Sequence, residues 1–241
     1  MSEDVRASFS RLMRGLNHDL KNPLGAADGY VDLLLQGYRG ELNEEQRQTL
    51  ERVRTLIATG IAILEDVVSF ARAELGELRV RPGDTDLGSV ARMAMDRHRK
   101  RADEARIALE FDGASGPVRA VTDPDLVGQV VDRLLANALD YAPDGGRVRV
   151  ATEAHGDRVR VLVRDDGPGV PPEDRERLLL PFEKGSAPAR ARETAGIGFG
   201  LSLAHALAQR LGGELRVDGA EDGGTVVMLE LPKAARDGAG A

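Results

Sequence analysis

A histidine stands beside an acid in residues 17–23, which read NHDLKNP. A neutral imidazole nitrogen is a nucleophile, and a neighbouring carboxylate can orient the ring or accept its other proton. Asn22 follows His18 by four residues, so a helix would put both side chains on one face. We therefore take His18 and Asp19 as candidate catalytic residues. The alternative is an ordinary histidine on a solvated surface.

Three segments of the second half together indicate a nucleotide site. Asn137 offers a side-chain oxygen of the kind that Mg²⁺ prefers. Residues 165–169 (DDGPG) follow an apolar strand, where the carboxylate of Asp165 can accept a hydrogen bond from an adenine amino group and the glycines let backbone approach a base. Residues 196–202 (GIGFGLS) open a helix, where backbone N–H groups can meet phosphate. Taken singly, an exposed asparagine or an Asp-Gly turn is the ordinary alternative; their order favours the nucleotide site.

Two long helices are expected before about Leu75. Asn43 with Gln46 is a capping-box start for the second helix. Two antiparallel helices cannot bury two apolar stripes, so we expect a dimeric antiparallel four-helix bundle with two helices per chain; packing against the rest of the chain is the alternative. His18 lies about 200° around the helix from Leu16, towards solvent. The first apolar stripe, spaced by three and four, consists of Phe9, Leu12, Leu16, Leu20, Leu24, Ala27, Val31 and Leu34.

Shorter elements of an α/β domain are predicted after Gly76. Helices are expected at about 87–104, 124–141 and 199–211. Strands are expected at about 107–111, 118–121, 147–154 and 158–164, with two more ending near Leu231. The proline-rich residues from Asp166 to about Gly196 read as a loop. Residues 233–241, rich in Ala and Gly, are expected to have no fixed structure.

The composition limits the classes of partner. Lys and Arg total 33 against 40 Asp and Glu, a net charge of −7, and aromatic residues are 3% with no Trp. This argues against a nucleic-acid or anionic-membrane binder. The absence of Cys excludes disulfides and cysteine metal sites. No apolar run approaches the roughly 18 residues of a membrane helix, and the acidic start lacks signal-peptide order. We expect a cytoplasmic protein with no direct membrane contact.

With these segments in this order, the chain resembles the sensor histidine kinases of bacterial two-component systems from about Phe9 to Leu231. Residues 17–24 are similar to their phosphoacceptor motif. Asn137, residues 165–169, Phe182 and residues 196–200 are similar to the asparagine, first glycine, phenylalanine and second glycine boxes of their ATP-binding domain. The resemblance implies a dimerisation and phosphotransfer domain at 1–75, followed at 76–232 by an ATP-binding catalytic domain, an α/β sandwich of the GHKL ATPase (Bergerat) type.

The same resemblance implies a function and its site residues. The chain would use ATP and Mg²⁺ to phosphorylate His18 in a homodimer, then pass the phosphoryl group to an aspartate of a response regulator. It would be cytoplasmic, or the cytoplasmic part of a longer sensor. Asn22, the third catalytic residue, would position water to dephosphorylate the regulator. Tyr141 would flank the base, and Lys184 would reach the phosphates. The implied nucleotide-binding residues are Asn137 (also the metal ligand), Tyr141, Asp165, Gly167, Gly169, Phe182, Lys184, Gly196, Gly198, Phe199, Gly200 and Leu201.

Two residues near Asn137 depart from the family pattern. Many related ATPases carry a water-activating Glu where this chain has Arg133, which disfavours an ATPase of that kind. Asp140 stands where the family commonly has Lys or Arg to meet phosphate. Either Arg133 meets the phosphate instead, or Arg133 and Asp140 form an ion pair or a solvated surface. These departures leave a weak or degenerate kinase, acting as a dimeric scaffold that binds ATP or a regulator, as the alternative function.

Gly25 and Gly29 fall on the helix face that carries His18. Each glycine costs roughly 1 kcal/mol relative to Ala inside a helix. One hypothesis is that they leave a smooth track for the backbone of the regulator. The equal alternative is local flexibility near Pro23.

Overall fold

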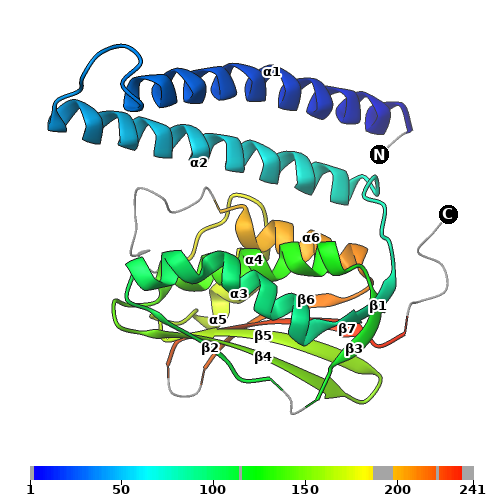
Figure 1. Ribbon diagram of the computed structural model, residues 1–241. Helices are drawn as coiled ribbons and strands as arrows, with labels where there is room; N and C mark the ends of the chain where they lie inside the picture. The colour runs from blue at the N-terminus through cyan, green and yellow to red at the C-terminus, as the bar shows by residue number, and fades with distance from the viewer. Residues whose placement is uncertain (1–2, 114–115, 187–197, 221–222, 235–241) are drawn as a thin grey trace. The chain divides into compact units, whose positions relative to one another are not determined.

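The computed structural model describes residues 3–113, 116–186, 198–220 and 223–234. The chain divides into two compact units, Met1–Leu75 and Gly76–Ala241 (Figure 1). The first unit is a helical hairpin and the second a mixed α/β sheet covered by helices. This confirms the predicted fold class of an α-helical segment followed by an α/β sandwich.

The helical unit consists of α1 (Glu3–Leu35) and α2 (Glu44–Glu74). Both sides of the predicted capping box are present, because Asn43 accepts from the N–H of Gln46 at 2.8 Å and Gln46 accepts from the N–H of Asn43 at 3.0 Å. Helix α1 continues through Pro23. Since proline has no N–H, it leaves the carbonyl of Asp19 without its helical partner.

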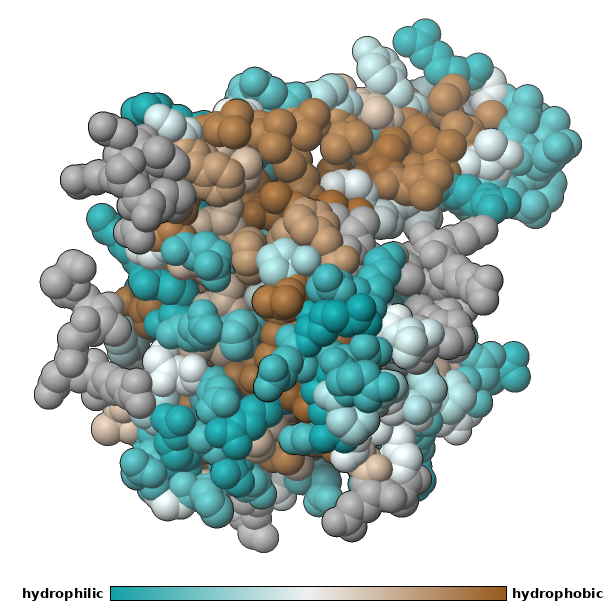
Figure 2. All heavy atoms as spheres, turned by 180° about the vertical axis from the view of Figure 1, so that it is seen from behind, coloured by the Kyte–Doolittle hydropathy of each residue, from teal (hydrophilic) through white to brown (hydrophobic). Residues whose placement is uncertain are grey.

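Part of the apolar stripe on α1 is not covered within the hairpin. Phe9, Leu12, Leu16 and Leu20 are exposed, whereas Val31 near the far end of the helix is buried. On α2, Val53 and Leu56 are exposed as well. Figure 2 shows apolar side chains gathered over the helical unit at the top of the view. A contiguous exposed apolar surface of this kind is typical of an interface.

The second unit is built on a five-stranded sheet in the order β2-β4-β5-β7-β6. Strands β2 and β4 are parallel, and the other pairs are antiparallel. The strands are β2 (Ala108–Phe111), β4 (Arg147–His155), β5 (Arg158–Asp165), β6 (Glu214–Gly219) and β7 (Thr225–Pro232). A separate antiparallel pair joins β1 (Gly83–Asp86) to β3 (Arg119–Thr122).

Three helices cover one face of this sheet: α3 (Leu87–Glu104), α4 (Pro124–Tyr141) and α6 (Gly200–Arg210) (Figure 1). Asp86 and Asp123 cap α3 and α4 as predicted. Alternate residues of β4 and β5 point inward, and Val148, Val150, Val159 and Val161 are fully buried. The core is completed by leucines and valines, among them Leu134, Leu135, Leu139, Leu203, Leu207, Leu229, Val127, Val130 and Val131.

Two local predictions were wrong, and one strand was not predicted. The segment expected to be a loop contains α5 (Pro172–Arg175) and the 3₁₀ turn η1 (Arg177–Leu179). Strand β1 was not expected at all. Lys233, assigned to the structureless tail, is held by backbone hydrogen bonds to Val121 and Asp157. The rest of that tail, beyond Ala234, lies outside the described residues.

Candidate functional site

His18 lies on α1 with its side chain 74% exposed, as the helix geometry predicted. Its Nδ1 atom is 3.0 Å from Oδ1 of Asp19. Its Nε2 atom is 3.1 Å from the amide nitrogen of Asn22, one turn further along the helix. The predicted proximity of these three side chains is therefore present within one helical turn.

These contacts favour one tautomer of the imidazole. A carboxylate only accepts hydrogen bonds, so the proton of the neutral ring belongs on Nδ1, facing Asp19. The amide of Asn22 only donates through its nitrogen, so Nε2 must accept. Nε2 therefore carries the lone pair, which accepts the hydrogen bond from Asn22 on an exposed helix face. Such a nitrogen can attack an electrophile that approaches from solvent.

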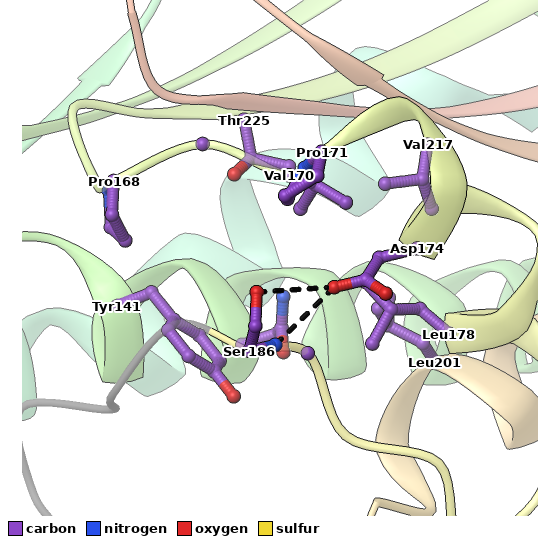
Figure 3. A pocket seen from close by; sticks show the side chains of 13 residues that line it. Tyr141, Pro168, Val170, Pro171, Asp174, Leu178, Ser186, Leu201, Val217 and Thr225 are labelled. Carbon is purple, nitrogen blue, oxygen red and sulfur yellow. Dashed lines mark hydrogen bonds between the residues drawn. The ribbon is translucent and has the colours of Figure 1, made fainter.

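A pocket of about 470 Å³ lies in the second unit between α4, α6 and the segment that follows β5 (Figure 3). This volume includes space that is open to solvent at the mouth of the pocket. Four predicted site residues line it: Asn137 and Tyr141 from α4, Gly169, and Leu201 from the first turn of α6. The other lining residues are Pro168, Val170, Pro171, Asp174, Leu178, Gly185, Ser186, Val217 and Thr225.

Asp165 lies at the end of β5, is only 2% exposed and does not itself line this pocket. Its Oδ1 accepts the N–H of Gly167 at 2.8 Å, and its carboxylate also accepts the N–H of Thr225, which lines the pocket. Burial raises the pKa of Asp165 to about 6, although the two backbone N–H groups counteract this. A buried, ionisable acceptor at the edge of a pocket is a frequent feature of binding sites.

Glycine is required where the backbone crosses itself around Asp165. Gly224 has φ +89°, and a Cβ there would overlap the carbonyl oxygen of Asp165. A Cβ at Gly167 would lie 2.5 Å from Oδ1 of Asp165 and 2.9 Å from the carbonyl oxygen of Tyr141. These close approaches bring the ends of β5 and α4 and the start of β7 together. They hold the pocket wall in place.

Phe182 and the start of α6 form the other predicted part of the site. The ring of Phe182, 67% exposed, meets buried Phe199 edge-on with ring centres 4.7 Å apart. Gly198 has φ +83°, and a Cβ there would lie 2.6 Å from the carbonyl oxygen of Glu183. Gly200 begins α6. Gly196 and the other residues from 187 to 197 lie outside the described residues.

Asp174 and Ser186 belong to the pocket but were not predicted. Asp174 is buried, and its Oδ2 accepts both the N–H and the hydroxyl of Ser186 at 3.3 Å (Figure 3). The hydrogen bonds from Ser186 and the charge of Arg177 hold the pKa of Asp174 below its ordinary value, against its burial. Arg177 also donates to the carbonyl of Lys184. One signal was present in the sequence: Pro172 followed by two acids is a helix start, which would have placed Asp174 on a fixed element.

The charges after Asn137 are arranged in an unexpected way. Asp140 pairs with Arg101 at the end of α3, a partner that the sequence did not indicate. Burial, and secondly the charge of Asp140, raise the pKa of Tyr141. Arg133 is half-buried on α4, and its predicted role towards phosphate stays a prediction. Lys184 is exposed, and its predicted reach to phosphate is likewise untested.

The donor set suits a magnesium ion that comes with a polyphosphate. Among the described residues, no group of three His, Cys, Asp or Glu side chains could hold a metal alone. Asn137 offers a single neutral oxygen in the pocket. Mg²⁺ commonly takes one or two protein oxygens and fills its other positions with phosphate and water. The site therefore fits Mg²⁺ bound together with a nucleotide.

No helix in the described part of the chain is long and apolar enough to cross a bilayer.

Residues 10–76 match the model of the His Kinase A (phospho-acceptor) domain. Residues 122–235 match the model of the histidine kinase-, DNA gyrase B- and HSP90-like ATPase.

Several known proteins are similar to the chain over nearly its whole length. The histidine protein kinase DivJ of Caulobacter vibrioides is 31% identical over 232 residues, which are 96% of this chain and 38% of DivJ. The adaptive-response sensory kinase SasA of a Synechococcus strain is 30% identical over 92% of this chain and 59% of its own length. Full-length ShkA, solved in complex with AMPPNP, is similar with a TM-score of 0.77 and 25% identity, over 95% of this chain and 47% of ShkA. The chain therefore spans 38% of the length of DivJ and 59% of the length of SasA.

Proposed function

Because this chain belongs to the sensor histidine kinases of two-component systems, we propose that it is an ATP-dependent protein-histidine kinase. It phosphorylates itself on His18 and passes the phosphoryl group to an aspartate of a response regulator. Residues 1–75 serve as the dimerisation and phosphotransfer domain, and residues 76–232 as the ATP-binding catalytic domain. Since ATP is a cytoplasmic metabolite, the proposal places this segment in the cytoplasm.

The observation that carries the proposal is the geometry around His18. Nδ1 faces the carboxylate of Asp19, and the lone pair of Nε2 becomes available for attack when its hydrogen bond from Asn22 opens. In the proposed step Nε2 forms a bond to the γ-phosphorus of ATP, the bond from that phosphorus to the bridging oxygen breaks, and ADP leaves. The ring gains positive charge as it bonds to phosphorus. The carboxylate of Asp19 stabilises that charge through the Nδ1 proton.

In this proposal, one set of residues binds the base of the nucleotide and another binds its phosphates. Asp165 accepts a hydrogen bond from the adenine amino group, and the glycines at 167 and 169 let the base lie against backbone. Tyr141 flanks the base. The phosphates lie towards the start of α6, where the N–H groups of the first turn, from Gly200 onward, can meet an anion. Phe182 and Lys184 border this end, and Gly196 is proposed, from its motif alone, to contact the phosphates as well.

A magnesium ion would be held by Asn137 and by the phosphates of ATP. Such an ion neutralises charge that develops on the phosphates during transfer. The side-chain oxygen of Asn137 serves as a neutral ligand from the wall of the pocket.

The proposed partners are a second copy of the chain and a response regulator. The exposed residues Phe9, Leu12, Leu16 and Leu20 support a four-helix bundle, because a second hairpin would bury them. A structure of the kinase ThkA with the response regulator TrrA, 21% identical to this chain, has the same fold with a TM-score of 0.63. The exposed face around His18 leaves room for a regulator to approach.

The test is incubation with Mg²⁺ and γ-labelled ATP. We expect label that is labile in acid and stable in alkali, as phosphohistidine is, and its complete loss in His18→Gln. His155→Gln is the matched control, because His155 is also exposed but lies at the end of β4. Label that persists in His18→Gln would contradict the proposal. ATP binding without any label in the unaltered chain would favour the scaffold.

Phosphatase activity is a second candidate function that one contact favours. The amide of Asn22 lies 3.1 Å from Nε2 of His18, where the phosphoryl group of a docked regulator would arrive. Asn22 could hold a water molecule in line with that group. We expect Asn22→Ala to slow the decay of a phosphorylated regulator while self-labelling continues. Equal decay with and without Asn22 would remove this function.

A further inference from the structure

Asp140 and Arg101 form an ion pair that joins the ends of α4 and α3. The pair is partly protected from solvent, because the Asp140 side chain is 16% exposed and that of Arg101 37%. Asp140 follows Asn137 by three residues, about 60° around the helix, so both lie on the same side of α4. The pair with Asp140 therefore places the guanidinium of Arg101 on the side of α4 that carries Asn137.

The negative charge of Asp140 acts on a residue that lines the pocket. It contributes, after burial, to the raised pKa of Tyr141, which lines the pocket. A carboxylate this close would repel the phosphates of a nucleotide unless a cation compensated for it. Arg101 provides that cation.

The guanidinium of Arg101 also has N–H donors that the pair with Asp140 does not use. A guanidinium carries five N–H donors. Among the residues that the structure describes, the side chain of Arg101 donates to Asp140 only. The Asp140 carboxylate therefore fixes the side chain, while other N–H groups remain available for a second anion. Arginine held in this way suits the geometry of a phosphate group.

We propose that Arg101, held in place by Asp140, binds the phosphate chain of the nucleotide beside Asn137. This inference rests on the proposed function, since it takes the ligand to be a nucleoside polyphosphate. It assigns the phosphate-binding cation to α3, a helix outside the nucleotide motifs. It also gives Asp140 a purpose: the carboxylate orients the arginine.

The chain contains a matched control for this pair. Arg97, one turn before Arg101 on α3, binds Asp132 of α4 through two hydrogen bonds of 3.2 and 2.8 Å. Asp132 precedes Asn137 by five residues and so lies about 140° away around α4. Both pairs join the same two helices, but only Arg101–Asp140 lies on the side of Asn137. Loss of Arg97 should weaken helix packing without touching phosphate.

The experiment measures the affinity of the whole chain for ATP, ADP and adenosine by calorimetry. We expect Arg101→Ala to lower ATP affinity by about tenfold or more, the usual effect of a lost charge-assisted hydrogen bond. Adenosine, which has no phosphate, should bind as before, and Arg101→Lys should recover part of the loss. Arg97→Ala should leave all three affinities unchanged. An equal loss for adenosine, or an unchanged affinity for ATP, would overturn the inference.

The double variant separates phosphate binding from simple charge compensation. If Arg101 binds phosphate, Arg101→Ala with Asp140→Asn will bind ATP more weakly than Asp140→Asn alone. If the double variant and Asp140→Asn bind ATP equally well, Arg101 only neutralises Asp140 and the inference is wrong. A failure of the proposed function would look different, because the unaltered chain would then either bind no nucleotide or bind ATP without labelling His18.

Discussion

The two units present their reactive groups in opposite ways. His18 is 74% exposed, and both of its partners come from its own helix, at one and four residues' distance. Asp165 is 2% exposed, and its surroundings come from β5, β7 and the end of α4. A group that must meet two different substrates has to project into solvent. A group that selects a ligand gains from a dry, fixed environment, where each hydrogen bond counts for more.

The same substitution should therefore have opposite effects in the two units. Gly224→Ala puts a Cβ against the carbonyl of Asp165 at a left-handed φ, and we expect a loss of roughly 2–4 kcal/mol in the free energy of unfolding. A Cβ at Gly25 meets nothing within 4 Å, so Gly25→Ala should stabilise α1 by up to about 1 kcal/mol. Thermal and urea unfolding measure both. If the two variants were destabilised equally, the proposed difference between the two units would be wrong.

Asp165→Asn should affect recognition of the base more than any property of His18. We expect ATP affinity to fall by about 10- to 100-fold, because a charged acceptor is lost. The preference for ATP over GTP should shrink too, since guanine has no amino group at the corresponding position. Competition binding measures this. If affinity for both nucleotides falls by the same factor, Asp165 only supports the backbone of Gly167 and Thr225.

Lowering the pH should protonate Asp165, which weakens its binding of the base and raises its contribution to the free energy of unfolding. The pKa of Asp165 is about 6 in the folded chain against an ordinary value of 3.8. Because the folded state holds this proton more tightly, the contribution of Asp165 to stability is full below pH 3.8 and falls as pH rises to about 6. The ionised carboxylate is the stronger acceptor for an adenine amino group, so base binding should improve over the same range.

Adenosine is the probe for this dependence, because it has no phosphate to titrate. Its affinity should drop as pH is lowered through about 6, and in Asp165→Asn this step should be absent. Histidines titrate in the same range, so the variant is measured in identical buffers. A step that survives in Asp165→Asn would belong to another group.

The smallest expected effect concerns the start of α2. Asn43→Ala removes the acceptor for the N–H of Gln46 and should destabilise the helical unit by about 1 kcal/mol. Asn43→Asp keeps an acceptor and serves as the control. Nucleotide affinity should be the same in both variants, because the pocket belongs to the second unit. Unfolding of the helical unit, followed by circular dichroism, measures the difference.

The sequence predicted most where partners are close along the chain. His18, Asp19 and Asn22 meet because spacings of one and four residues fix their neighbourhood on a helix, and the capping box at Asn43 follows the same rule. Asn137, Gly169 and Leu201 were found by motif, and the pocket brings them together. Phe182 and Phe199 were found in the same way and are in contact.

Contacts between distant elements could not be predicted. Asp174 meets Ser186, and Arg101 meets Asp140, only because of how α5 and α3 pack on their neighbours. Strand β1 was missed for a similar reason: Thr85 is held by the carbonyl of Thr122 in a distant strand, and a four-residue strand has little pattern of its own. A single sequence carries no direct signal for such pairs.

The most direct test of the account is to identify the ring nitrogen that carries the phosphoryl group. Chains with isotope-labelled histidine are incubated with ATP and Mg²⁺ and examined by NMR, where coupling between phosphorus and the ring distinguishes the two nitrogens. Asp19 holds the proton on Nδ1, so we expect phosphorylation of His18 on Nε2. Phosphate on Nδ1, or on a residue other than His18, would contradict it.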